Sequence, residues 1–152
     1  MNTEVKNHRN GVEVVPDKMI KEIKDIFSTI HTSVEKYVIS DIRKELITGL
    51  QIKGWSDKIF LDRKSKISIT GEQDDIGLCI QTGNVSRVYA DLLKLQTLFV
   101  QGEIKAGIII VPTSECGKQY ASNTASMERL MRELNIFNQV ITMPLVVIGF
   151  SE

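Results

Sequence analysis

Two uninterrupted apolar segments in the second half of the chain most limit what it can fold into. The first is Ala106–Val111 (AGIIIV), which Pro112 ends, and the second is Leu145–Phe150, which follows Pro144. Strands that are covered on both faces have such continuous β-branched runs, whereas half-exposed strands alternate. Since a helical pattern lies between the two segments, they are expected to be joined by right-handed crossovers. We therefore expect an α/β fold with a mixed β-sheet flanked by helices.

The N-terminal third predicts an arm followed by helix. Residues 1–16 are polar and contain Asn, Gly and Pro, so we expect a flexible arm that docks late or frays. Asp17 can cap a helix, and apolar residues then recur at three- and four-residue spacing. This helix should end by Gly49 and is either continuous or broken near Thr32–Ser33.

The rest of the chain first shows β-type and then helical patterns. Short β-prone segments between polar turns are typical of an antiparallel meander, with strands expected at residues 58–62, 66–69 and 76–82 and turns at 63–65 and 71–75. Helical spacing then predicts one helix at residues 88–99 and another at residues 127–134. A polar loop at residues 113–122 precedes the second helix. Ser122 or Asn123 is expected to cap the last helix.

Length and charge limit the range of partners. A chain of 152 residues suits one domain, so we expect a single domain over residues 1–152. Its 19 basic and 19 acidic residues give a formal net charge of zero, whereas phosphate-binding proteins usually carry a basic excess. DNA binding would therefore have to come from a local basic surface or from a dimer cleft. No apolar run has the ~20 residues that a membrane span needs, and residues 1–16 lack the pattern of a secretory signal, so we expect a cytoplasmic protein.

The cysteines and histidines do not predict a site of their own. Cys79 and Cys116 are far apart in the sequence and form no CxxC pair, so neither a disulfide nor a zinc site is expected. His8 and His31 have no partner at metal-ligand spacing, which argues against histidine-based catalysis.

The segment Ile67–Asn84 is where a catalytic constellation would fit. Metal-dependent cleavage of a phosphodiester needs carboxylates that hold Mg²⁺ beside the phosphate. Residues two apart on a strand point to the same face, so an acid and a glutamine or lysine at such positions can share one metal site.

The run from Gly77 to Pro112 resembles the core of the BglII-like restriction endonucleases, members of the PD-(D/E)XK nuclease superfamily. The similarity rests on Asp91-Leu92-Leu93-Lys94, on the strand Gly107–Pro112, and on Gln81, which stands where the family has its third active-site residue. It extends over roughly residues 66–150 in order and spacing. The resemblance implies a restriction-endonuclease-like fold, double-stranded DNA as substrate, Mg²⁺ as cofactor, and a homodimer that cuts both strands.

The chain departs from the family pattern at two positions. Cys79 replaces the glutamate two residues before Gln81, and Thr70 stands where the first metal-binding aspartate belongs. Thiols and threonine hydroxyls are poor Mg²⁺ ligands. Nearby acids could substitute, which gives a catalytic set of Gln81 with Asp62, Asp74 and Asp75, and a metal site at Asp62 and Asp75. The alternatives are that Asp74–Asp75 form a solvated turn, that Asp62 is a strand-end charge, and that Gln81 is a buried, hydrogen-bonded amide.

Polar residues on the following helix form a stripe. Asn84, Arg87, Asp91 and Lys94 are spaced by three, four and three positions, so they share one helix face. In the family context this stripe could orient Gln81 and a phosphate. The alternatives are ordinary ion pairs for Asp91 and a helix cap for Asn84.

The loop after the first buried strand could contact DNA. In open α/β sheets the loops beyond the carboxyl ends of strands commonly bear ligand contacts. Ser114, Lys118, Gln119 and Asn123 have side chains that can meet phosphates or base edges. The alternative is a solvated loop without ligand.

Two functions therefore remain open, beside the alternative that the chain is an unrelated small α/β protein whose resemblance to the family is coincidental. The first is a Mg²⁺-dependent type II DNA endonuclease. The second is a catalytically inactive protein with the nuclease fold, which serves as a DNA-binding or regulatory module.

Overall fold

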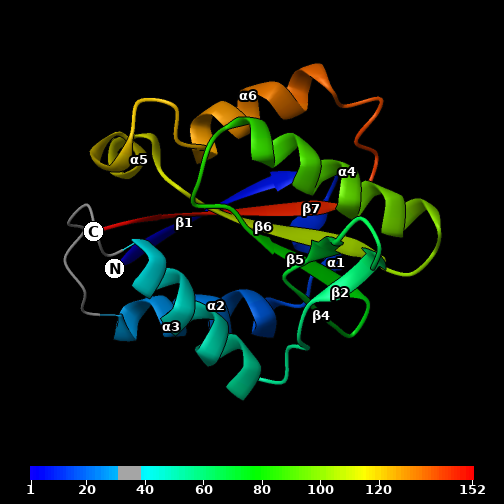
Figure 1. Ribbon diagram of the computed structural model, residues 1–152, viewed down its shortest axis with the longest axis horizontal. Coiled ribbons are helices and arrows are strands. Elements are labelled where there is room, and N and C mark those ends of the chain that lie inside the picture. Colours follow the sequence, from blue (N-terminus) through cyan, green and yellow to red (C-terminus); the bar gives the residue numbers. More distant parts are fainter. Residues whose placement is uncertain (31–38) are drawn as a thin grey trace.

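The continuous apolar segments form the parallel centre of a mixed, five-stranded sheet with the strand order β1-β7-β6-β5-β4 (Figure 1). The computed structural model describes residues 1–30 and 39–152. β5 (Ile76–Ile80), β6 (Ala106–Pro112) and β7 (Leu145–Ser151) are parallel, while β1 (Asn2–His8) and β4 (Gly71–Gln73) pair antiparallel at the edges. The expected α/β fold with a mixed sheet is confirmed.

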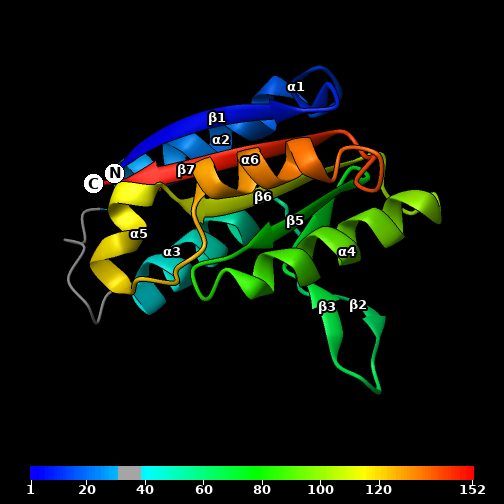
Figure 2. The same ribbon diagram turned by 90° about the horizontal axis from the view of Figure 1, so that it is seen from above.

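Helices cover both faces of this sheet (Figures 1 and 2). Successive side chains of a strand point to opposite faces. On β6, Ile108 and Ile110 belong to the apolar cluster that contains α2 (Asp17–Thr29) and α3 (Ile39–Ile52). The intervening Ile109 and Val111 pack in a second cluster, with α4 (Ser86–Val100) and α6 (Met127–Ile136). Among the described residues, no helix is both long and apolar enough to cross a bilayer.

The N-terminal segment differs from the expected flexible arm. Residues 2–8 form β1, which pairs with β7 from Asn2↔Ser151 to His8↔Leu145, and α1 (Gly11–Val14) follows. The His8 ring is buried and its Nε2 lies 2.8 Å from the carbonyl oxygen of Ile141. An edge strand is held mainly by backbone hydrogen bonds to its neighbour, so it needs few apolar side chains. Because the polar sequence of residues 2–8 hides such a strand, the prediction of a flexible arm was wrong.

The first helical region is longer than expected at its end. α3 continues to Ile52 and contains Gly49, which was expected to stop it. A Cβ on Gly49 would lie 2.8 Å from Cγ2 of Ile26 in α2. Gly49 therefore permits the close approach of two helices. The expected break near Thr32–Ser33 lies outside the described residues.

The expected meander is divided into two pairs of strands. β2 (Ile59–Asp62) and β3 (Ile67–Ile69) form a separate two-stranded sheet, and β5 pairs instead with β4. The polar segment 71–75 is thus mainly a strand, and only Asp74 and Asp75 have the positive φ angles of a tight turn.

The polar loop expected at residues 113–122 contains a helix. α5 (Ser114–Tyr120) begins after Thr113, whose side chain accepts a hydrogen bond from the backbone N–H of Cys116. α6 has Ser126 at its N-cap, so neither Ser122 nor Asn123 caps it. Short helices with little apolar periodicity are hard to detect from sequence, and this one depends on its cap.

Candidate phosphate-binding site

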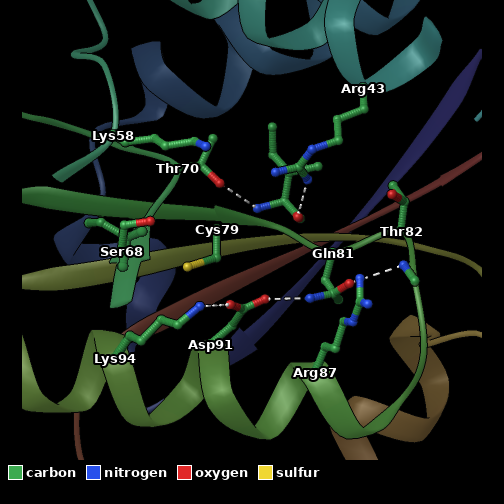
Figure 3. A pocket seen from close by; sticks show the side chains of 13 residues that line it. Arg43, Lys58, Ser68, Thr70, Cys79, Gln81, Thr82, Arg87, Asp91 and Lys94 are labelled. Atoms are coloured by element: carbon green, nitrogen blue, oxygen red, sulfur yellow. Dashed lines mark hydrogen bonds and ion pairs between the residues drawn. The ribbon is translucent and has the colours of Figure 1, made fainter. Parts of the chain in front are cut away.

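A cavity of about 360 Å³ lies at the carboxyl end of β5, between α3 and α4 (Figure 3). β4 pairs with β5 only as far as Leu78, so the end of β5 is left open at the edge of the sheet. Polar side chains from four separate parts of the chain line the cavity: Arg43, Lys58, Ser68, Thr70, Gln81, Thr82, Arg87, Asp91 and Lys94.

Gln81, Asp91 and Lys94 form one hydrogen-bonded chain along the wall of the cavity (Figure 3). Gln81 Nε2 donates to Asp91 Oδ2 at 2.8 Å, and Lys94 Nζ donates to Asp91 Oδ1 at 2.9 Å. Gln81 Oε1 accepts from the backbone N–H of Gly83 at 3.0 Å, which fixes the orientation of the amide. The structure therefore brings together Gln81, Arg87, Asp91 and Lys94, four of the residues that the sequence singled out.

Thr70 stands where β4 begins and takes part in the strand pairing itself. Its backbone N–H donates to the carbonyl of Leu78, and its Oγ1 accepts from the N–H of Ile80 at 3.1 Å. The hydroxyl thus accepts a hydrogen bond from an N–H of β5 that lies beyond the paired residues of β4. Its oxygen is already engaged as an acceptor at this position.

Cys79 faces the same cavity but is only 2% exposed. Burial raises the pKa of its thiol well above the ordinary value, and the nearby negative charge of Asp91 raises it further. A protonated, buried thiol behaves as a small apolar side chain and is a poor ligand for a hard cation.

Within the part of the chain that the structure describes, four cations and one carboxylate line the cavity. Arg43 donates to the carbonyl oxygen of Ile80, and burial lowers its pKa, although Asp91 partly opposes this. Within residues 1–30 and 39–152, neither Lys58 nor Arg87 forms an ion pair. Because the single carboxylate is already bonded to Lys94, the remaining positive charge is available to an anion.

Sequence reasoning missed Arg43 and Lys58. Arg43 follows the buried Ile42 on α3, so it marks the border of the buried helix face. Its hydrogen bond to the carbonyl oxygen of Ile80, 37 residues later, depends on how α3 packs on the sheet. Lys58 lies just before the β2–β3 pair, whose separation from the main sheet was not expected. No local motif would have identified either residue.

The acids proposed as substitutes do not line the cavity. Asp62 ends β2, where its carboxylate accepts from the N–H of Ser65 at 2.6 Å, and hydrogen bonds from Ser65 lower its pKa. Asp74 and Asp75 form the turn before β5. Asp75 and Gln81 are thus at opposite ends of a strand, roughly 20 Å apart at ~3.3 Å per residue. The structure does not bring Asp62 or Asp75 together with Gln81, so a catalytic or metal-binding role for these acids stays a prediction.

The remaining predicted residues lie in several places. Asn84 lies two residues before α4, and its side chain accepts from the N–H of Ser86 at 2.8 Å, but Val85 is the N-cap of the helix, so Asn84 is not the cap that was expected. Asn123 is exposed, and its carbonyl accepts from the N–H of Val85, which holds residue 123 against the loop after β5. Ser114 donates to Glu128 at 2.6 Å. Lys118 and Gln119 are exposed on α5, and none of the four predicted DNA contacts lines the cavity.

The donor atoms of the cavity do not fit Mg²⁺. This ion requires several oxygen ligands, usually including one or two carboxylates. The cavity offers a hydroxyl that caps a strand, a buried thiol, and a carboxylate that is held by Lys94 and Gln81. In the part of the chain that the structure describes, no three His, Cys, Asp or Glu side chains cluster as metal ligands.

A mixed sheet of this topology, with a polar site at the open end of β5, defines a protein of the restriction-endonuclease fold. The family model described as "Restriction endonuclease BglII/BglIII" matches residues 3–150. The chain belongs to this family, as the motif around Asp91 and Gly107–Pro112 predicted.

Solved structures show the same fold. The crystal structure of restriction endonuclease BglII complexed with a DNA 16-mer matches with a TM-score of 0.86 and 14% identity, over 100% of this chain and 79% of that one. Free BglII matches with a TM-score of 0.78 and 16% identity, over 100% of this chain and 80% of that one. No curated protein sequence matches the chain significantly.

Proposed function

We propose that this chain binds double-stranded DNA through a backbone phosphate held in the cavity at the end of β5, without metal-dependent cleavage. The observation that supports this most is the charge of the cavity: among residues 1–30 and 39–152, four cations and one already engaged carboxylate line it. Restriction endonucleases of this family generally depend on a metal ion. Here the positive charge comes from side chains instead.

The chemistry of the cations suits a phosphate. Arg87 and Lys94 extend from the same face of α4, and Arg43 approaches from α3 on the other side. Arginine donates in a planar fork to phosphate oxygens, and lysine adds a mobile point charge. Such contacts fix a duplex without reading its sequence. The BglII structure that this chain resembles is a complex with DNA, which supports a duplex as the partner.

A binding titration with three proteins tests the proposal. The affinity for a labelled DNA duplex is measured at several salt concentrations for the unaltered protein, for Arg87→Gln, and for Lys24→Gln as a control on the exposed side of α2. We expect Arg87→Gln to weaken binding roughly fivefold to tenfold and to lower the salt slope by about 1. The control should bind like the unaltered protein. Equal affinity of all three proteins would contradict the role of the cavity.

The second candidate is a Mg²⁺-dependent type II endonuclease, which family membership favours. It would use Gln81 together with acids that approach the cavity only after a rearrangement, namely Asp62, Asp74 or Asp75. Incubation of plasmid and phage DNA with Mg²⁺ or Mn²⁺ decides between the candidates. Discrete fragments that disappear with EDTA and in Gln81→Ala would establish the nuclease, whereas intact DNA supports binding alone.

We further propose that the DNA-bound form is a homodimer in the cytoplasm. A two-fold symmetric pair presents two equivalent cavities to the two strands of a duplex. Sedimentation of the protein with a short duplex should then give two chains per duplex. One chain per duplex at saturation would contradict the dimer and leave the phosphate site unaffected.

A further inference from the structure

The β2–β3 pair projects from the body of the molecule beside α4, as Figure 2 shows. Its two strands form a sheet of their own, in which Ile59 pairs with Ile69 and Phe60 with Ser68. Residues 63–66 connect the strands at the far end. We call residues 58–69 the hairpin and residues 63–66 its tip.

The tip is strongly basic. It contains Arg63, Lys64 and Lys66 within four residues, and all three are exposed. The one acid beside them, Asp62, uses its carboxylate to accept the N–H of Ser65, which fixes the turn. The guanidinium of Arg63 lies 4.9 Å from the centre of the Phe60 ring, so it is held above that ring. A chain with no net charge thus concentrates positive charge at one projecting point.

The base of the hairpin is anchored to the body. Ile69 is 2% exposed and belongs to the apolar cluster that includes α4, and Ile59 and Leu61 pack against that cluster. Beyond these residues the hairpin is exposed. The tip is therefore carried on a fixed support, and its position relative to α4 is defined.

The hairpin and the cavity share a wall. Lys58 and Ser68, at the base of the hairpin, line the cavity together with residues of α4 (Figure 3). From Ser68 the strand advances two residues to Lys66, roughly 7 Å at ~3.3 Å per residue, and the turn of residues 63–66 follows. The hairpin is thus a short two-stranded ribbon with basic side chains at its end. The major groove of DNA, about 12 Å wide, admits such a ribbon.

We infer that the hairpin tip is a second phosphate-binding surface, which contacts the DNA backbone across a groove from the phosphate in the cavity. This inference rests on the proposed function of the cavity. The tip binds the opposite strand of the same duplex through Arg63, Lys64 and Lys66. These contacts strengthen binding to any sequence, because they reach phosphates and not base edges.

The shape of the duplex distinguishes this arrangement from simple attraction to any polyanion. The major groove of A-form RNA is deep and narrow, so side chains cannot enter it. A hairpin that spans a B-form major groove should therefore contribute to DNA binding and not to binding of an RNA duplex of equal length and charge. A tip that merely attracts anions would contribute equally to both.

The test compares three variants, of which the two double variants are matched in charge. Lys64→Gln/Lys66→Gln removes two charges from the tip, Lys18→Gln/Lys24→Gln removes two from α2 on the opposite face of the sheet, and Arg87→Gln alters the cavity. All four lysines are exposed, so folding, checked by circular dichroism, should be retained. Affinities for a DNA duplex and for an RNA duplex are measured over a range of salt concentrations.

The inference predicts that the tip variant binds the DNA duplex roughly tenfold more weakly or worse, with a salt slope lower by about 2. The affinity of the tip variant for the RNA duplex should fall much less. The α2 variant should bind the DNA duplex and the RNA duplex like the unaltered protein. If the tip variant binds DNA like the α2 variant while Arg87→Gln is impaired, the second surface is refuted and the cavity remains. Equal loss for DNA and RNA would also refute the groove-spanning contact. If Arg87→Gln binds normally and only the tip variant is weakened, the proposed function of the cavity fails instead.

Discussion

Gln81 donates a hydrogen bond from Nε2 to Oδ2 of Asp91 at 2.8 Å, and both side chains are buried. This contact links the end of β5 to α4 and determines the character of the cavity. With Lys94 on its other oxygen, Asp91 is held as a structural acceptor. Asp91, the one carboxylate that lines the cavity among the described residues, is thus neutralised by Lys94, and the cations around it determine what can bind.

Asp91→Asn should strengthen DNA binding. The asparagine oxygen can still accept from Gln81, while the loss of one negative charge makes the cavity more attractive to a phosphate. We expect the affinity at low salt to rise several-fold, roughly the effect of one added phosphate contact. Fluorescence anisotropy with a labelled duplex measures this change.

The matched control is Asp25→Asn on α2, which removes the same charge from an exposed ion pair with Lys21. It should leave the affinity close to that of the unaltered protein. If Asp91→Asn weakens binding, the carboxylate itself takes part in the function, and its role as a structural acceptor is wrong.

Thr70→Asp/Cys79→Glu should create a Mg²⁺ site that the unaltered protein lacks. An aspartate at position 70 can accept the hydrogen bond from Ile80 that Thr70 now accepts. A glutamate at position 79 would lie near Lys94 and Arg43, whose charges favour the ionised thiol and would likewise favour a carboxylate. Together they supply the oxygen ligands that the ion requires.

Thermal unfolding with and without Mg²⁺ measures this effect. A ligand that binds only the folded state stabilises it by about 2.7 kcal/mol at about 100 times its dissociation constant. We expect Mg²⁺ to raise the melting temperature of the double variant, and EDTA to reverse the rise. An equal rise in the unaltered protein would contradict the view that Thr70 and Cys79 have removed the metal site.

The buried thiol of Cys79 should lower the free energy of unfolding at high pH. Burial raises its pKa in the folded state, so above the ordinary value of 9.0 the unfolded chain releases a proton that the folded chain keeps. The unfolded state then binds fewer protons, and the free energy of unfolding falls as pH rises. This group's contribution is fully present below pH 9.0 and decreases above it, by at most about 1.4 kcal/mol per pH unit.

Urea unfolding at several pH values, compared with Cys79→Ala, isolates this contribution. The alanine variant is less stable throughout because it leaves a cavity. The difference in stability between the two proteins should nevertheless shrink above pH 9.0. A difference that stays constant up to about pH 10.5, well past the ordinary thiol pKa, would mean that Cys79 ionises freely in the folded protein.

The centre of the fold could be predicted from the sequence, and its edges could not. The run Ala106–Val111 must be covered on both faces, and the helical spacing between it and Leu145–Phe150 leaves few alternatives. β1 and β4 are edge strands whose polar side chains carry no apolar signal. Their positions depend on backbone pairing with β7 and β5, which only the assembled sheet provides.

The candidate site, like the fold, could be predicted only in part from the sequence. Gln81 and Asp91 were identified because they lie on a strand and on the next helix, in an order that the family shares. The acids nearest in sequence, Asp74 and Asp75, lie at the other end of β5, because proximity along a strand does not bring residues together. Arg43 belongs to a helix that is remote in sequence, and its contribution appears only when α3 packs on the sheet.

The most direct test of the account is the affinity of the purified protein for a DNA duplex in EDTA and in Mg²⁺ at equal ionic strength, with the DNA recovered and sized afterwards. If side-chain cations hold the phosphate, binding in EDTA is at least as tight as in Mg²⁺, and the DNA is recovered intact in both. Binding that is lost in EDTA, or DNA that is cut when Mg²⁺ is present, would contradict a metal-independent phosphate site.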